Sequence, residues 1–296
     1  MVLVALLWST AGVATRHLDA ARSFEVTFWR SLFAALGMFV ALCLMRGWRL
    51  WALVRSGGWA LWVVGLCWAV MFTNFMLALT LTSVATVLVT LAIAPLITAL
   101  FARLFLHHRL PGRTWSAIAL AGLGIGWMFG RQALADGGSM TGALVALGVP
   151  IAGATNWTLL QHLHQRHARD PSVAEPEMLP AVLIGALMSV AITAPLAWPF
   201  AASGHDLGLL AGLGVFQLAV PCLLSVMLTK VLAAAEISLL ALLEVVFGVA
   251  LAWVGAGEVP GANTLSGGAL VIGALLVNEA LAMRERRRVS PVAARQ

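Results

Sequence analysis

The stretch LAIAPLITALFARLFLHHRLPG, residues Leu91–Gly112, recurs in outline further along the chain. Shifting the sequence by 149 positions places Leu240–Gly261, LALLEVVFGVALAWVGAGEVPG, beneath it without a gap, and both stretches close on Pro-Gly. Few identities survive, but one shift serves three separate apolar stretches, which indicates an internal repeat. The same shift also aligns Trp8 with Trp157 and Gly124 with Gly273.

The composition is that of a membrane protein. Hydrophobic residues make up 61% of the chain and charged residues 10%, and the mean hydropathy is +0.96. An ordinary soluble domain carries roughly 25% charged residues. The apolar residues form continuous runs and do not alternate with polar ones, so we predict an all-α integral membrane protein and not a barrel.

Ten apolar runs are long enough to be predicted as transmembrane helices. They cover residues 2–18, 24–45, 58–80, 83–106, 114–131, 141–161, 178–200, 207–229, 237–256 and 264–283. Only Leu81 and Thr82 separate the third run from the fourth, which predicts a tight hairpin. With the repeat, these runs predict a first five-helix unit in residues 1–134 and a second in residues 135–296, with a short basic tail.

The distribution of cations predicts the orientation. With the N-terminus placed in the cytoplasm, fourteen of the 18 Lys and Arg residues fall on the cytoplasmic side. By the positive-inside rule we expect a multi-pass protein of the bacterial inner membrane with both termini in the cytoplasm. The other four cations are Arg16, Arg22, Arg30 and Arg131.

An odd number of spans in each unit gives the repeat a mechanical meaning. The second unit enters the membrane upside down relative to the first, and inverted repeats around a central site are typical of secondary transporters. Such a pair can exchange conformations and open one cavity to either side of the membrane. We therefore expect ten helices in two inverted five-helix repeats around a central cavity.

Trp8 and Trp157 are a repeat-matched pair in the middle of the first and sixth predicted spans. Tryptophan in a membrane protein is usually enriched at the interfaces, and a buried indole N–H needs a partner. One interpretation is that the two side chains line the cavity and contact or gate the substrate. The other is that they pack between helices.

Four uncharged polar side chains lie within predicted spans and are candidates for hydrogen bonds to a substrate. A polar group in hydrocarbon must find a partner in the bundle or in a wet cavity. Bonds between helices explain any single one of them equally well. The four are Asn74, Asn156, Gln161 and Gln217.

Two charged residues also lie inside predicted spans. Glu244 is about two turns into the ninth span, and its ionised form is costly there unless it is paired or hydrated. It is the candidate proton carrier. Arg30 lies six residues into the second span and either anchors the helix at the interface or is a fixed cation, for a substrate carboxylate or for Glu244.

Other chemistry finds little support in the sequence. His162, His164 and His167 do not converge on one helix face, so we predict a solvated segment and no metal site. The chain has no GxxxxGK[ST], HExxH or GxSxG motif, and we expect no catalytic residue, no cofactor and no enzyme activity. Nucleic acid is not an expected partner because the cations lie in short loops and the tail. Cys43, Cys67 and Cys222 lie in apolar runs and are expected to be small core residues.

The chain resembles the drug/metabolite transporter superfamily in its EamA-type ten-helix branch, over nearly all 296 residues. The motifs that carry the resemblance are LLWST at Leu6–Thr10, Phe28-Trp29-Arg30, Ala94-Pro95, and GEVPG at Gly257–Gly261 followed by a glycine-rich last span. The overall pattern is similar to the amino-acid exporters of the YddG type. The resemblance implies two inverted five-helix repeats forming a basket around a central cavity.

The resemblance also implies efflux of aromatic and other neutral amino acids across the inner membrane. The chain contains no tyrosine, so any tyrosine role in the family would fall to Phe72, Phe75 or tryptophan. His108-Arg109 stands where many relatives carry Glu, and Val245 follows Glu244 where relatives often have Pro. We expect the transport to be facilitated diffusion and not proton antiport. The expected partners are a small-molecule substrate and the lipid bilayer, and the expected oligomeric state is a monomer or a weak homodimer. The alternatives are export of nucleosides or other amphipathic compounds and, more distantly, a membrane-embedded enzyme or a receptor.

Overall fold

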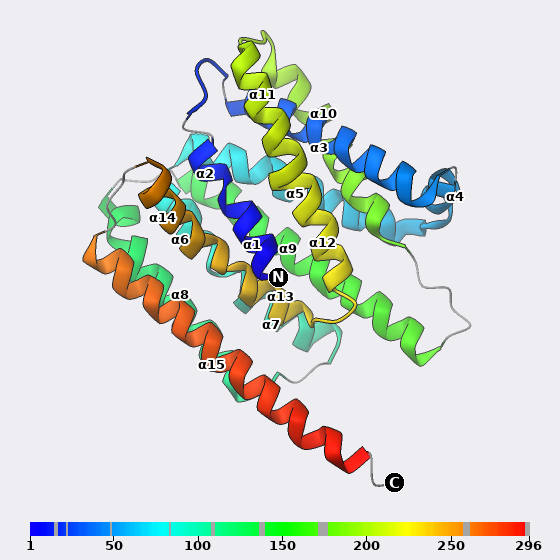
Figure 1. The fold of residues 1–296 in the computed structure, drawn as a ribbon, viewed down its shortest axis with the longest axis vertical. Coiled ribbons are helices and arrows are strands. Elements are labelled where there is room, and N and C mark those ends of the chain that lie inside the picture. The colour runs from blue at the N-terminus through cyan, green and yellow to red at the C-terminus, as the bar shows by residue number, and fades with distance from the viewer. Residues whose placement is uncertain are drawn as a thin grey trace.

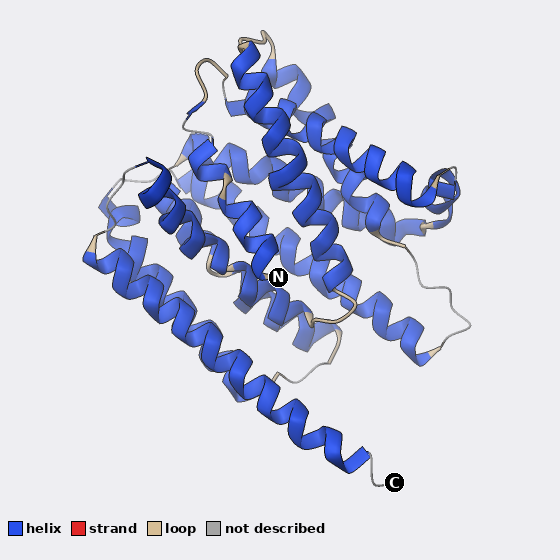
Figure 2. Ribbon diagram, viewed as in Figure 1, coloured by secondary structure: helices blue, strands red, loops and turns tan. Residues whose placement is uncertain are grey.

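The computed structural model describes residues 1–14, 17–21, 23–47, 49–82, 84–107, 110–135, 140–170, 177–256 and 261–293. In this part of the chain all regular structure is helical (Figure 2). Several predicted features lie outside the described residues: Arg16, Arg22, His108, Arg109, Arg295, and positions 257–260 of the GEVPG motif.

The helices follow the predicted spans closely, and several spans consist of two or three consecutive segments (Figure 1). The first half contains α1 (Val2–Ser9), α2 (Ala11–Ala14), α3 (Ser23–Arg46), α4 (Arg49–Ser56), α5 (Gly58–Leu81), α6 (Val84–Leu91), α7 (Ala94–Phe105) and α8 (Gly112–Ala135). The second half contains α9 (Met140–Arg169), α10 (Leu179–Ala197), α11 (Gly204–Gly212), the π-helix η2 (Leu213–Ala219), α12 (Val220–Leu228), α13 (Ala234–Ala241), α14 (Leu243–Ala256) and α15 (Ala262–Ala293).

Seven helical stretches of the described chain are long and apolar enough to cross a membrane. Two shorter apolar helices, Val2–Ala14 and Ala262–Asn278, correspond to the first and last predicted spans, and α8 corresponds to the fifth. The protein is therefore a multi-pass membrane protein, and ten crossings stay a prediction. The short helix α4 was not predicted, because it lies in a connection that also carries arginines.

The connection between α5 and α6 is as short as predicted. Helix α5 ends at Leu81 and α6 begins at Val84. A Cβ atom on Gly142 would lie 2.6 Å from Thr82 Cβ, so α9 passes directly against this turn. Only a glycine at position 142 permits that approach.

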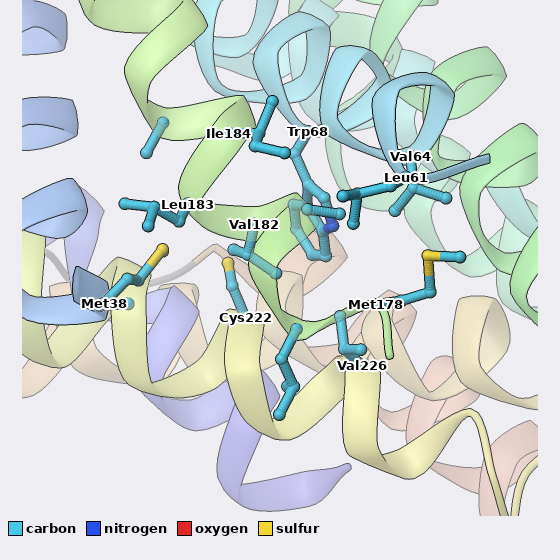
Figure 3. Packing of buried hydrophobic residues seen from close by; sticks show 14 of the residues in the cluster. Met38, Leu61, Val64, Trp68, Met178, Val182, Leu183, Ile184, Cys222 and Val226 are labelled. Atoms are coloured by element: carbon cyan, nitrogen blue, oxygen red, sulfur yellow. The ribbon is translucent and has the colours of Figure 1, made fainter. Parts of the chain in front are cut away.

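Two apolar clusters account for much of the described core. The larger one joins α3, α5, α10 and α12, with contributions from α9 and α13. Figure 3 shows Met38, Trp68, Val182 and Cys222 converging from these four helices. The second cluster joins α7, α8, α13, α14 and α15. The described core thus contains two packed clusters. Helix α6 contacts α8 of the second cluster, and α9 contacts α7 of the same cluster.

Small residues bring two helix pairs into backbone contact. A Cβ atom on Gly267 of α15 would lie 2.5 Å from the Gly124 carbonyl of α8. Small residues at a helix interface permit this close approach of two backbones in a membrane protein. The same device brings α10 against α5, because a Cβ on Gly185 would lie 2.4 Å from Trp68 Cβ.

Candidate functional site: a central cavity

A cavity of about 170 Å³ lies between the two apolar clusters. Its walls come from α1, α3, α5, α6, α7, α9, η2, α12, α13 and α14. A single water needs about 10–15 Å³ of such space, so the cavity has room for a small organic molecule.

One wall of the cavity is apolar and aromatic. It is built by α5, α6, α7 and α9, which contact one another. Trp68 of α5 packs edge-on against Trp157 of α9, with ring centroids 5.5 Å apart and planes at 85°, and Phe72 lies 5.5 Å from Trp68. The other lining residues of this wall are Met71, Phe75, Leu88, Leu91, Ala94, Val149, Pro150 and Gly153.

The other wall carries the polar groups. It is built by α1, α3, η2, α12, α13 and α14, and α1 contacts η2, α12, α13 and α14. Its polar lining residues are Arg30, Gln217, Cys222, Ser238 and Glu244, together with the indole of Trp8. The cavity therefore combines a mostly apolar lining with a few charged and hydrogen-bonding side chains that come from these helices.

Two broken helices meet at the cavity. The chain of α6 and α7 is interrupted at Ala92–Ile93, and that of α13 and α14 at Leu242. Pro95 lies in the first turn of α7, where its missing N–H leaves no α-helical bond unmade. The repeat shift of 149 residues places Glu244 on Pro95, and Glu244 occupies the first turn of α14, where the helix dipole stabilises a carboxylate.

The π-helix η2 brings Gln217 into the polar wall. It ends just before Pro221, which lacks the N–H that an uninterrupted α-helix would use. Gln217 Nε2 donates to the Trp8 carbonyl oxygen of α1 over 3.2 Å, while its Oε1 is buried without a partner among the described residues. Trp8 and Cys222 line the cavity together with Gln217.

Arg30 is not an interfacial anchor. Its side chain is 2% exposed and lines the cavity, and its Nε has no hydrogen-bond partner in the described part of the chain. Glu244 and Cys222 line the same cavity as Arg30, so two charged side chains and a thiol contribute to its lining.

Six of the nine predicted site residues line the cavity, and three do not. The six are Trp8, Arg30, Phe72, Trp157, Gln217 and Glu244. Asn74 Nδ2 donates to the Val145 carbonyl of α9 over 3.2 Å, and Gln161 Oε1 accepts the Ala234 N–H at the start of α13 over 2.8 Å. These two side chains hold helices together. Asn156 is fully buried beside Trp157, and both its amide atoms lack a partner within the described residues.

Sequence reasoning missed Trp68 and Cys222 as cavity residues. Trp68 lies in an apolar span and has no repeat-matched tryptophan, but the 149-residue shift places it on Gln217, a predicted site residue, and this signal was not used. Cys222 was predicted as a core residue, and it is buried and not disulfide-bonded, but it also contributes to the polar wall. One signal was available: Cys222 comes directly after Pro221, which marks a helix irregularity.

Two buried carboxylates outside the cavity act as structural anchors. Glu25 accepts the N–H groups of Ala201 and Ala202 over 2.8–3.0 Å. Asp206 accepts those of residues 19, 20, 21 and 203 over 2.7–3.2 Å. Among the described residues, Asp206 also lies close to Asp19 and His205, and all three side chains are of types that can bind a metal ion. Its oxygens are already occupied by backbone donors, so the set is explained without an ion.

Comparison with known proteins agrees with this architecture. A solved crystal structure of 21% identity superposes with a TM-score of 0.74, over 95% of this chain and 96% of that one, and it shares the fold. None of the curated proteins compared with the chain matches it. Residues 1–130 match the model of the EamA-like transporter family, which indicates a membrane transporter of small metabolites.

Proposed function

We propose that this protein is a secondary transporter that exports neutral amino acids, aromatic ones included, across the bacterial inner membrane. The observation that carries the proposal is the amphipathic cavity at the junction of two broken helices. In secondary transporters, broken helices of this kind surround the substrate site near the middle of the membrane. An amino acid has an apolar side chain for the aromatic wall and a polar end for the wall that carries Arg30, Gln217 and Glu244.

The two halves of the chain are proposed to be inverted repeats. The helix starts at Ala94 and Leu243 are related by the 149-residue shift, and Leu91, the last residue of α6, corresponds to Leu240, the last residue but one of α13. The helix contacts also occur in related pairs: α7 with α9 corresponds to α14 with α1, and α10 with α5 corresponds to η2 with α3. These correspondences support two units of five helices each.

We propose that transport proceeds by alternating access. The cavity lies between the two apolar clusters, so a change in their relative position would open it to one side or the other. Packed clusters are stiff internally, and motion is expected at their boundary. Because Glu244 is the single carboxylate that lines the cavity among the described residues, we propose facilitated diffusion and not proton antiport.

The proposed aromatic contacts to the substrate come from Trp8, Phe72 and Trp157. Each lines the cavity, whereas Trp59 is 69% exposed on the outer face of α5. Aromatic pairs contribute roughly 0.5–1.5 kcal/mol beyond their buried area. We therefore expect Trp8→Ala and Trp157→Ala each to weaken substrate binding about two- to tenfold, and Trp59→Ala to leave it unchanged.

Uptake of radiolabelled L-phenylalanine into proteoliposomes tests the proposal. Down-gradient transport is expected in the wild-type protein, and an imposed pH gradient should not drive accumulation. Transport that is unchanged in both cavity tryptophan variants would sink the site assignment, and accumulation driven by the pH gradient would show proton antiport. If a panel of nucleosides competes and amino acids do not, the substrate class is wrong.

A further inference from the structure

We infer that Arg30 and Glu244 bind the two ends of a zwitterion, with Arg30 holding the substrate carboxylate and Glu244 the substrate ammonium group. The inference rests on the proposed transport function and assigns each charge of the cavity to one group of the substrate. It makes the protein selective for molecules that carry both charges.

The two side chains face the same space without neutralising each other. Both line the cavity. Among the described residues no salt bridge joins Arg30 with Glu244. The two charged groups therefore line one cavity without pairing directly with each other.

Neither charge has a hydrogen bond that would compensate its burial. Arg30 Nε is buried without a partner in the described chain, and no bond of this part of the molecule ends on the Glu244 carboxylate. An ionised group within a membrane protein is costly unless it is paired. Such residues face the bundle interior or a wet cavity and mark the path of a substrate. A zwitterion placed between them completes both pairs at once.

The local structure favours this direction of binding. Glu244 is in the first turn of α14, where the positive end of the helix dipole stabilises the anionic carboxylate, so a cationic group is its natural partner. Arg30 offers a planar guanidinium, which suits the two oxygens of a carboxylate. The nearby Gln217 Oε1 is a further buried acceptor without a partner among the described residues, and it is available to the ammonium group.

The apolar body of the substrate then has one direction in which to extend. The polar groups come from the wall built by α1, α3, η2, α12, α13 and α14, so a side chain that leaves the headgroup reaches the aromatic wall. Trp68, Phe72 and Trp157 form that surface, and the ring centroid of Trp68 lies 5.5 Å from that of each of the other two. This arrangement selects a short distance between the two charges and an apolar substituent beside them.

The experiment compares three molecules that share a phenyl group. L-Phenylalanine carries both charges, phenethylamine lacks the carboxylate, and 3-phenylpropionate lacks the amine. Their competition against labelled L-phenylalanine is measured in proteoliposomes of the wild type, Arg30→Gln and Glu244→Gln. In the wild type both analogues should compete about 10- to 100-fold more weakly than L-phenylalanine, the loss expected for one charge-assisted hydrogen bond.

Each variant should lose one half of this discrimination. Arg30→Gln should bind L-phenylalanine no better than phenethylamine and still reject 3-phenylpropionate. Glu244→Gln should show the opposite pattern. The matched controls are Arg46→Gln and Glu177→Gln, which remove an exposed ion pair at the far end of α3 and should keep the wild-type selectivity. Arg30→Lys should restore part of the carboxylate preference because it keeps the positive charge.

The outcomes separate this inference from the function on which it rests. If the wild type neither binds nor transports L-phenylalanine, the proposed function fails. If the wild type transports it but both variants keep the full preference for the zwitterion, the inference is overturned and the pair is structural. Binding of L-phenylalanine by detergent-purified variants, measured as a shift in thermal unfolding, shows whether each variant is folded, and the same reversal of preference is expected there.

Discussion

At the scale of single residues, polar side chains inside the bundle divide into those that hold helices together and those that face the cavity. Asn74 and Gln161 each bond a backbone atom of another helix. Gln217 uses one amide atom in the same way and keeps the other free of partners among the described residues, beside the cavity. Residue type alone does not separate these cases, because an amide satisfies either role.

Asn74→Ala should affect stability and not substrate affinity. The side chain donates one bond to α9 and does not line the cavity. Hydrogen bonds between membrane helices contribute about 0.6 kcal/mol on average and up to about 1.7 kcal/mol. We expect a lower thermal unfolding midpoint in detergent with an unchanged KM for L-phenylalanine. Gln217→Ala is the comparison, since it should raise KM; a raised KM in Asn74→Ala would return Asn74 to the substrate site.

At the scale of helices, the interruptions matter more than the regular parts. Pro150, the π-helix η2 and the segments around the breaks at Ala92–Ile93 and Leu242 lie at the cavity together with the continuous helices α3 and α5, while α8 and α15 pack away from it. An interrupted helix leaves backbone groups and helix ends free to face a ligand, which a continuous helix cannot do. The contact between α8 and α15 is instead a stability element.

Gly267→Ala should loosen the packing of α15 on α8. The added Cβ would lie 2.5 Å from both the Gly124 carbonyl oxygen and Met128 Cγ, so the helices must separate. Overpacking of this kind costs roughly 1–3 kcal/mol. The expected result is a lower unfolding midpoint with transport retained in the protein that remains folded.

Gly126→Ala on α8, two residues after Gly124, is the matched control for this change. A Cβ at Gly126 meets no atom within 4 Å, and alanine is the better helix former, so the unfolding midpoint should stay the same or rise slightly. Equal destabilisation by the two substitutions would contradict the proposed role of the α8–α15 contact.

At the scale of the whole molecule, α3 spans the bundle from one end to the other. Glu25 at its start bonds the segment that precedes α11, and α4 follows its last residue. A helix of 24 residues spans about 36 Å, which exceeds the roughly 30 Å hydrocarbon core. Helices α4 and α11 accordingly lie at different ends of α3 in Figure 1.

Single cysteines at positions 56 and 205 should therefore be labelled from opposite sides of the membrane. Ser56 and His205 are both exposed and are related by the 149-residue shift. In a protein whose Cys43, Cys67 and Cys222 are replaced by alanine, we expect an impermeant maleimide to label His205→Cys in intact cells. Ser56→Cys should react only after permeabilisation. Labelling of both positions from one side would refute the inverted repeat and the orientation together.

Much of the fold could be predicted from the chain because the bilayer constrains it locally. Apolar runs of the right length must be helical in hydrocarbon, and the helices follow the predicted spans even at the short Leu81–Thr82 turn. The breaks at Ala92–Ile93 and Leu242 were not predicted, although both lie within the repeated stretches. The cavity could be predicted only in part. Whether Asn74 reaches α9 or the cavity, and that Trp68 and Cys222 line it, depends on how helices distant in sequence rotate and pack, and no local pattern encodes that rotation.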